Sequence, residues 1–425
     1  MSFGNIFRDL NVSSLATTRS TASKSITNLF SAKIRTIGSL LQYERSPGVW
    51  ITVKSLNVPS TQLGNMYTLP REINAYLPCS FNYNGTVLAV GLVGLVLGDS
   101  FLSILTNTNG FYNQQSIPVP PDDLGPSTGS VSLNNTGDIL AVGAGNDNLD
   151  VGAVWIYANV GGIWTLQGTK ITGPGEIGPG AFGTTVSLNG AGNLLAVGCP
   201  FDNGNVGSVY IFNISYPSAP VFVARLTGPN IAPSTANFGI GINFSKDGST
   251  LAVGAPGFNA PGSVYIFTKV LGIWTQEAIL YAQTGYTPTS LGFTVSLSGD
   301  GNILAAGAVP YPVLYYRSPG LGGSWSAGTL IPRPHDYVTE PNLTTTSISL
   351  DGNTLCTNSR INNNGVGASW IFTQKSPGNW IQNGPGFVGT GFVVNPGQGF
   401  TTLSADGKVA ATIDTVSKTS LWVFI

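Results

Sequence analysis

The residues best suited to hold a metal ion lie in one short segment, "GNDNLDVG" at 145–152. It offers Asp147 and Asp150 beside two asparagines, and calcium prefers carboxylate and amide oxygens as ligands. The segment lacks a closing Glu and supplies too few oxygens for the six to eight that calcium usually takes. A polar turn is therefore favoured over a calcium site, and no other cofactor is predicted.

Histidine chemistry has one candidate, His335, in "RPHDY", with Asp336 beside it. A Ser-His-Asp or Cys-His centre needs a histidine oriented by a second group. A lone histidine in a connecting segment is more commonly a surface residue. The chain has three cysteines, Cys79, Cys199 and Cys356. They are too few and too far apart in the sequence for a disulfide framework or a zinc site.

Carboxylates offer a second kind of chemistry. Five of them follow equivalent predicted strands and should share one face: Asp99, Asp147, Asp150, Asp202 and Asp414. Glycosidases use two neighbouring carboxylates, but the sequence does not give the distance between any two of these. We expect no enzyme, with a carboxylate-dependent glycan hydrolase as an alternative.

The elements that must position these residues come from an internal repeat. "NLLAVGCPFDNGNVGSVYIF" at 193–212 returns as "STLAVGAPGFNAPGSVYIF" at 249–267. The "LAVG" motif recurs with decay, from 88–91 to "VAAT" at 409–412, in steps of 51 to 56 residues that define seven repeats. Such a period indicates a repeat architecture.

Each repeat reads as four short strands. Hydrophobic residues make up 42% of the chain, so the chain is not disordered. Helix formers are scarce, whereas Val, Ile, Thr and aromatic residues alternate with turn residues, which indicates many short strands. An "NG" or "DG" pair precedes the second strand in five repeats and supplies the positive φ of a tight hairpin. The Asp of these pairs is therefore interpreted as a turn former. The fold predicted is a seven-bladed β-propeller of four-stranded antiparallel blades.

A tryptophan recurs on the predicted fourth strand, at Trp164, Trp274, Trp325 and Trp380. Packing between blades is favoured over stacking on a sugar. The seventh repeat ends without a fourth strand, and "SPGVWITV" at 46–53 nearly copies "SPGNWIQN" at 376–383. Residues 48–56, with Trp50, are therefore predicted to close the ring. Residues 39–45 resemble a third strand, and their place stays open.

Two longer segments carry a family resemblance. "FGTTVSLNGAGNLLAVGCPFDNGNVGSVYIF" at 182–212 and "FGIGINFSKDGSTLAVGAPGFNAPGSVYIF" at 238–267 resemble FG-GAP repeats, the repeat of integrin α-subunit propellers and of many microbial and viral surface proteins. The resemblance spans roughly residues 46–425 and implies a seven-bladed propeller with an adhesive or structural role. The family's calcium loops are shortened here, so they are not carried over.

The N-terminal segment differs from the repeats. Residues 1–37 hold five basic residues and one acidic residue, whereas the remainder holds 13 basic and 18 acidic residues. The predicted domains are therefore a basic arm, 1–37, and the propeller, 38–425. The arm should form a short amphipathic helix that docks onto other proteins of an assembly, through Ile26, Leu29, Phe30, Lys33, Ile34, Arg35 and Ile37.

These features favour a non-enzymatic structural or interaction protein, associated with a virion or a cell surface. A carbohydrate-binding propeller is the alternative, so a glycan is a possible partner. The body lacks clusters of Lys and Arg, so no nucleic acid is expected. The longest apolar run, at 87–98, is too short to span a bilayer, and no secretory signal peptide is recognisable.

Overall fold

The structure is a computed structural model in which the chain divides into two compact units, Met1–Pro59 and Ser60–Ile425. The described residues are 34–37, 40–46, 49–53, 67–68, 79–91, 102–108, 111–117, 120, 122–123, 129–228, 236–257, 261–282, 288–318, 323–335, 343–359, 367–387, 398–414 and 420–424.

The first unit contains a three-stranded antiparallel sheet. Its strands are β1 (Ile34–Ile37), β2 (Leu40–Ser46) and β3 (Val49–Val53). The helix predicted for the arm is wrong over Ile34, Arg35 and Ile37, because this "IRTI" segment pairs with Leu40–Tyr43 across a two-residue connection. The other arm residues, Ile26, Leu29, Phe30 and Lys33, lie outside the described residues. The β1–β2 pair also crosses the predicted domain boundary at 37/38, and residues 39–45 fall largely in β2.

The predicted closing strand is also wrong. Trp50 lies in β3, which pairs with β2 so that Trp50 faces Glu44. Only Pro47 and Gly48 separate the two strands, and a short connection makes local pairing far less costly than pairing with a distant strand. The chain end, β31 (Ser420–Phe424), pairs instead with β4 (Tyr67–Thr68).

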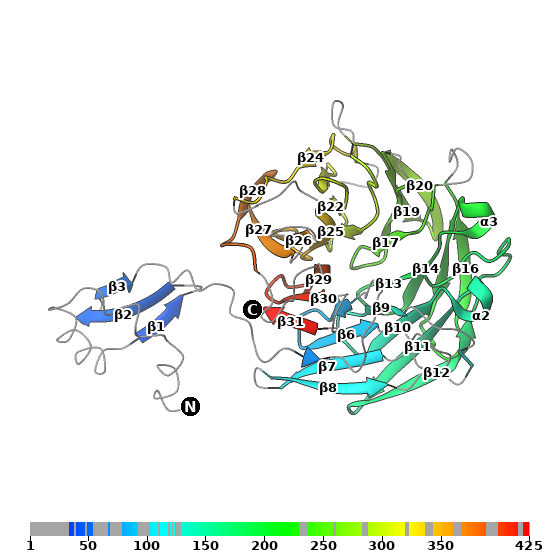
Figure 1. Cartoon of the computed structure of the whole chain (residues 1–425), viewed down its shortest axis with the longest axis horizontal. Coiled ribbons are helices and arrows are strands. Elements are labelled where there is room, and N and C mark those ends of the chain that lie inside the picture. The colour runs from blue at the N-terminus through cyan, green and yellow to red at the C-terminus, as the bar shows by residue number, and fades with distance from the viewer. Residues whose placement is uncertain are drawn as a thin grey trace. The chain divides into compact units, whose positions relative to one another are not determined.

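The second unit is a ring of four-stranded antiparallel sheets, the blades (Figure 1). Six blades in the described residues consist of consecutive strands, and a further sheet has the order β29-β30-β31-β4. The first three consecutive blades are β5 (Cys79–Phe81), β6 (Val87–Gly91), β7 (Leu102–Thr108), β8 (Phe111–Ile117); β9 (Gly129–Leu133), β10 (Ile139–Ala144), β11 (Ala153–Val160), β12 (Ile163–Ile171); and β13 (Thr185–Leu188), β14 (Leu194–Cys199), β15 (Ser208–Asn213), β16 (Val221–Leu226).

Three further blades of consecutive strands follow. They are β17 (Gly241–Phe244), β18 (Thr250–Ala255), β19 (Ser263–Val270), β20 (Ile273–Leu280); β21 (Val295–Leu297), β22 (Ile303–Ala306), β23 (Val313–Tyr316), β24 (Thr329–Leu330); and β25 (Leu343–Ile348), β26 (Thr354–Ser359), β27 (Ala368–Ser376), β28 (Asn379–Gln382). The remaining four-stranded sheet joins β29 (Gln398–Leu403) and β30 (Ala410–Asp414) to β31 and β4. The predicted all-β propeller with four-stranded antiparallel blades is confirmed, with six blades of consecutive strands in the described residues where seven were predicted.

Backbone hydrogen bonds join the first hairpin turn of each blade to that of the next. They run from Tyr83 N to Asn135 O, Asn135 N to Gly190 O, Gly190 N to Lys246 O, Lys246 N to Gly299 O, Gly299 N to Leu350 O, Leu350 N to Ala405 O, and Asp406 N to Tyr83 O, at 2.8–3.1 Å. The last bond returns to the first turn, so the turns form a closed ring. This closure holds the inner strands side by side around one axis.

The Asp residues of the "DG" turns are turn formers, as predicted. Asp247 Oδ1 accepts the hydroxyl of Ser245 at 2.7 Å and the N–H of Ser249 at 3.0 Å. Asp300 and Asp351 repeat the arrangement. Partial burial raises the pKa of these three carboxyls, but the hydrogen bonds outweigh it and leave each pKa below its ordinary value.

The hydrophobic core lies between neighbouring blades. Trp164, Trp274 and Trp380 are buried in these interfaces, and Trp274 packs against Phe244 with ring centroids 5.8 Å apart. Trp325 lies before the fourth strand β24 and not on it as predicted. It packs against the core between the blades β17–β20 and β21–β24 and donates its Nε1–H to Glu277 Oε1 at 3.0 Å. The predicted role of the tryptophans in packing between blades is confirmed.

Candidate functional site

The "FG" pairs at 182–183 and 238–239 each connect one blade to the preceding one. Phe182 and Phe238 are fully buried. The N–H of Phe182 donates to Val151 O at 3.0 Å, and that of Phe238 donates to Val206 O at 3.1 Å. Each N–H therefore reaches the loop between the second and third strands of the blade before it, and the motif positions those loops around one end of the ring.

The glycine of "LAVG" is required by the same junction. A Cβ added to Gly198 would lie 2.1 Å from Gly239 O, and one added to Gly254 would lie 1.8 Å from Gly292 O. Both distances are far below any normal contact. The repeated glycine is therefore a consequence of close backbone packing between blades.

The candidate calcium loop lies at this end of the ring, in the short turn α2 (Asp147–Asp150). Asp147 is fully buried, and its Oδ2 lies 2.9 Å from Lys170 Nζ, whereas Asp150 is exposed. The structure therefore does not direct the two carboxylates at a common ion. Over the described part of the chain, no group of three or more His, Cys, Asp or Glu side chains is placed to hold a metal.

The next blade carries an equivalent loop, α3 (Asp202–Asn205), built around a buried carboxylate. Asp202 accepts the N–H of Ile177 at 2.8 Å and an N–H of Arg225 at 2.5 Å. It also accepts the hydroxyls of Ser208 and Tyr210. These hydrogen bonds hold the α3 loop and the segment around Ile177 against strands β15 and β16. Asp202 therefore has a structural role as an anchor of the loop.

The five carboxylates predicted to share a face therefore do not form a catalytic pair in the described residues. Asp147 and Asp202 are each paired with a basic residue from the fourth strand of their blade. Asp99 and the side chain of Asp414 lie outside the described residues. The basic partners, Lys170 and Arg225, were missed in the sequence because nothing local relates them to the loops.

A second carboxyl, Glu176, packs beside the Asp202 anchor. Its Oε1 accepts the N–H of Gly180 at 2.5 Å. Burial raises the pKa of Glu176 to about 7, and the charge of Asp202 adds to the rise, while hydrogen bonds from Gly180 and Cys199 and the charge of Arg225 oppose it. Glu176 therefore titrates near neutrality.

This titration predicts a pH-dependent stability. The folded state holds the Glu176 proton up to about pH 7, whereas an exposed Glu loses it near pH 4.3. The stabilisation that comes from protonated Glu176 is therefore fully present below the unfolded-state pKa of the carboxyl, and it is lost as the pH rises through the folded-state pKa. We expect the Tm of the wild type to fall between pH 5 and pH 8 relative to that of Glu176→Gln, measured by scanning calorimetry. Parallel pH profiles of the two proteins would contradict this assignment.

The two loops have the same backbone but different residues at the tip. Leu149 has φ 58° and ψ 51°, and Gly204 has φ 67° and ψ 44°, both in the left-handed region. The Leu149 side chain is 89% exposed, so packing does not compensate its backbone conformation.

Exchanging these tips should change stability in opposite directions. A non-glycine residue in the left-handed region destabilises the folded state by about 1–2 kcal/mol. Replacing it with glycine removes this strain, but the greater conformational entropy of glycine in the unfolded chain offsets part of the gain. We expect Leu149→Gly to stabilise the fold by about 0.5–1 kcal/mol and Gly204→Leu to destabilise it by a similar amount, about 0.5–1 kcal/mol, in urea titrations. A Cβ at Gly204 would meet nothing within 4 Å, which isolates the backbone effect. A destabilising Leu149→Gly would show that the leucine side chain has a packing role.

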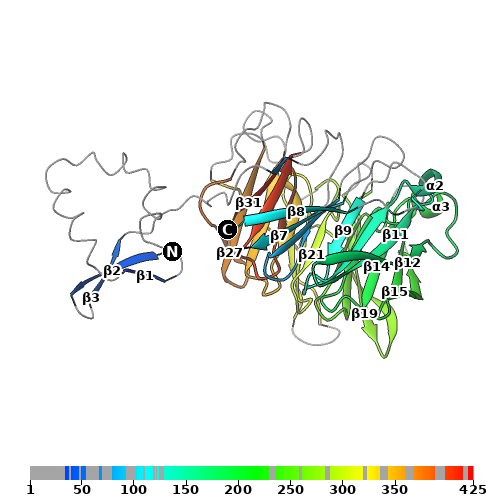
Figure 2. The same ribbon diagram turned by 90° about the horizontal axis from the view of Figure 1, so that it is seen from below.

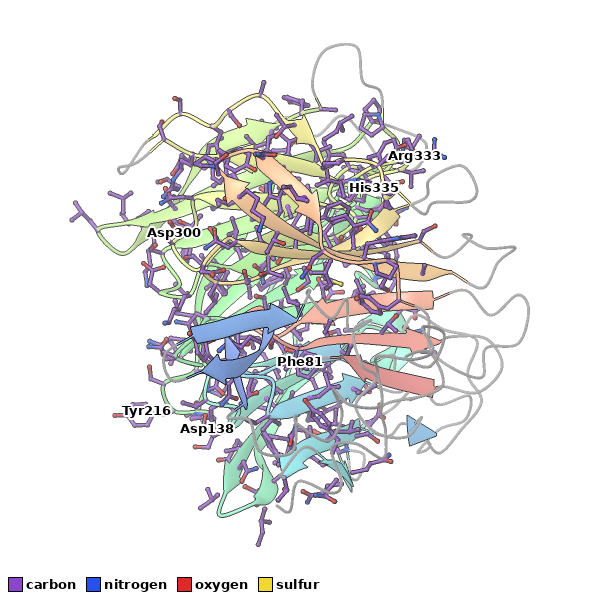
Figure 3. All side chains as sticks on the ribbon, turned by 90° about the vertical axis from the view of Figure 1, so that its left-hand side faces the viewer. Phe81, Asp138, Tyr216, Asp300, Arg333 and His335 are labelled. Atoms are coloured by element: carbon purple, nitrogen blue, oxygen red, sulfur yellow. The ribbon has the colours of Figure 1, made fainter. Side chains whose placement is uncertain are left out.

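His335 has no catalytic setting in the described residues. It is exposed, and its backbone N–H donates to Gln382 Oε1 at 2.7 Å. Figure 3 places it at the end of the ring opposite Asp138, Tyr216 and Asp300. Asp336 lies outside the described residues, so its predicted pairing with His335 stays a prediction.

The first strands of the seven four-stranded sheets in the described residues, here called the inner strands, are β5, β9, β13, β17, β21, β25 and β29. They line an open cavity of about 500 Å³ at the centre of the ring, here called the axial cavity. Its wall is rich in serine and threonine and comes from all seven inner strands, including Ser80, Ser132, Ser187, Ser296 and Thr402. Sequence reasoning missed this cavity. The available signal was a small polar residue two positions before the first turn in every repeat.

Large apolar side chains are exposed on the outer hairpins of three successive blades. This hairpin-tip surface consists of Val160, Ile163, Tyr216, Val221, Phe222, Val223, Val270, Leu271 and Ile273. The hairpins β11–β12, β15–β16 and β19–β20 carry it, and the hairpin that ends β19 projects from the ring in Figure 2. Tyr216 likewise points outward in Figure 3.

Comparisons with known proteins identify the architecture. No protein-family model matches the chain, and no curated protein matches it. A crystal structure of a protein from Lactobacillus plantarum is similar with a TM-score of 0.51 and 11% identity, over 84% of this chain and 92% of that one. The β-propeller domain of Cps50 (Swd1) from Myceliophteria thermophila is similar with a TM-score of 0.51 and 14% identity, over 85% of this chain and 98% of that one. The shared feature is the β-propeller fold.

No helix in the described part of the chain has the length and apolarity needed to cross a membrane.

Proposed function

We propose that the protein is a rigid, non-enzymatic propeller that binds other proteins within a larger assembly, at a virion or a cell surface. In this proposal β29–β31 and β4 act as the seventh blade of the ring. The observation that carries the proposal is the hairpin-tip surface, where Leu271 is 97% exposed and Tyr216 is 77% exposed. Exposed apolar side chains gathered on neighbouring elements are typical of protein contact sites.

The repeat chemistry supports the same class of function. The "FG" and "LAVG" residues serve the junctions between blades, as Phe182 and Gly198 show, and the buried carboxylates of the loops serve as anchors. This use of the motifs fits the adhesive and structural proteins whose FG-GAP repeats the sequence resembles. It leaves the exposed hairpins as the contact-forming part of the blade.

The test is a variant of the hairpin-tip surface. We expect Tyr216→Ser/Leu271→Ser/Ile273→Ser to fold with a wild-type Tm, because all three side chains are exposed. It should no longer co-purify with the assembly from which the wild type is isolated. The matched control is Leu330→Ser/Ile381→Ser, which removes exposed apolar residues from two other blades. Retention of the triple variant together with the control would contradict the proposal.

A further inference from the structure

The axial cavity contains a ring of polar side chains at one level. Each inner strand contributes one residue. Six of these residues pair with the second residue of the "LAVG" or equivalent motif, and the seventh pairs with the third residue of "VAAT". The ring members are Ser80, Ser132, Ser187, Asn243, Ser296, Ser347 and Thr402, opposite Ala89, Ala141, Ala196, Ala252, Ala305, Cys356 and Ala411. All seven line the cavity.

Six of the seven side chains already accept one hydrogen bond from a neighbouring blade. The donors are the N–H groups of Leu133, Leu188, Phe244, Leu297, Ile348 and Leu403, at 2.8–3.1 Å from the oxygens of Ser80, Ser132, Ser187, Asn243, Ser296 and Ser347. A serine hydroxyl that accepts one bond can still donate one, and an asparagine keeps its NH₂. The ring therefore presents fixed oxygens with donors available to a ligand.

The lining of the cavity is uncharged. No Asp, Glu, Lys, Arg or His is among the described residues that form its wall. The titratable group in the wall is Cys79, and burial, with the charge of Cys356 second, raises its pKa to about 12. An ion would lose its hydration here without meeting an opposite charge, so the wall favours a neutral ligand.

Apolar side chains alternate with the polar ring. Val131, Val186, Ile242 and Val295 also line the wall. A molecule with both hydroxyl groups and C–H faces matches such a surface. The cavity volume of about 500 Å³ lies within the range of ordinary small-molecule sites.

We propose that the axial cavity binds a neutral polyhydroxylated small molecule of monosaccharide size. The ring hydroxyls and Asn243 donate to its oxygens, and the valines and isoleucine contact its carbon skeleton. This binding is separate from the protein contacts proposed for the hairpin-tip surface.

The experiment is isothermal titration calorimetry of the full chain with glucose, galactose, mannose, fucose and inositol. Glucuronate and glucose 6-phosphate serve as charged counterparts. We expect at least one neutral compound to bind, with a Kd that does not change between pH 5 and 9 or with added salt. The charged counterparts should bind at least about tenfold more weakly.

Two variants place the ligand in the cavity. Ser187→Ala/Ser296→Ala removes two hydroxyls and should weaken binding about tenfold. Thr402→Val keeps the side-chain shape and should weaken it severalfold, which keeps the test open if the double variant fails to fold. Ser296→Thr should retain binding because blade seven already has threonine at this position. Thr275→Ala on the outer strand β20 is the control.

Three results would overturn the proposal: no binding by any neutral compound at 10 mM, tighter binding of the charged compounds, or unchanged binding in Thr402→Val. The triple hairpin-tip variant should bind the same compound as the wild type. A failure of protein contacts is thereby distinguished from a failure of this site.

Discussion

Gly254→Ala is expected to lower the free energy of unfolding by at least about 3 kcal/mol, or to prevent folding. The added Cβ would lie 1.8 Å from Gly292 O, and further backbone atoms of Gly292 lie within 3.0 Å. Backbone atoms cannot move aside as a flexible side chain can, so the two blades would have to separate. Urea denaturation followed by far-UV circular dichroism measures the change.

The control for this substitution is Gly272→Ala. Gly272 has a φ of 86°, but a Cβ there would meet nothing within 4 Å. It should therefore show only the backbone cost of about 1–2 kcal/mol. If Gly254→Ala were no more harmful than Gly272→Ala, the close approach of the blades would not be the reason for the repeated glycine.

Asp202→Ala is expected to cost about 3–5 kcal/mol, the usual penalty for breaking a buried ion pair from one side. The substitution removes the carboxylate partner of Arg225 at 2.5 Å, so that Arg225 keeps its hydrogen bonds to Ser208 and Gly175. It also leaves the N–H of Ile177 without its acceptor at 2.8 Å. Thermal and urea unfolding should both report the loss. Asp150→Asn is the control, because Asp150 is exposed and asparagine tolerates its left-handed backbone (φ 65°), so it should change stability by less than about 0.5 kcal/mol.

A double-mutant cycle separates the ion pair from the other bonds to Asp202. Arg225→Ala should cost much less in the Asp202→Ala background than in the wild type, because the interaction it removes is already absent. Additive effects of the two substitutions would show that the pair contributes nothing, and the anchoring role of Asp202 would have to rest on Ser208, Tyr210 and Ile177 alone.

The repeat predicted the blades because every signal in it is local. Alternating apolar residues, the "NG" and "DG" turns and the recurring tryptophans each act within one hairpin or one blade interface. Closure is not local. The segment around Trp50 resembles the fourth strand of a blade in sequence. It forms a hairpin with β2, its neighbour in the chain, whereas β31 pairs with β4.

The candidate site was predicted less well than the fold. The buried positions of Asp147 and Asp202 depend on Lys170 and Arg225, which come from the fourth strand and reach the loops only once the blade is folded. The polar ring of the axial cavity was readable in principle, since Ser132, Ser187 and Ser296 occupy the same place in their repeats. These residues come together to line one cavity only when the folded ring arranges the inner strands around a common axis.

Hydrogen exchange tests the proposed protein-binding role most directly. The full chain should be compared as the isolated protein and within its native assembly, peptide by peptide. We expect protection in the assembly at the tips of the hairpins β11–β12, β15–β16 and β19–β20, with little change at β23–β24 and β27–β28. Equal exchange at the first three tips in both states would contradict the proposal that this propeller is a scaffold for protein contacts.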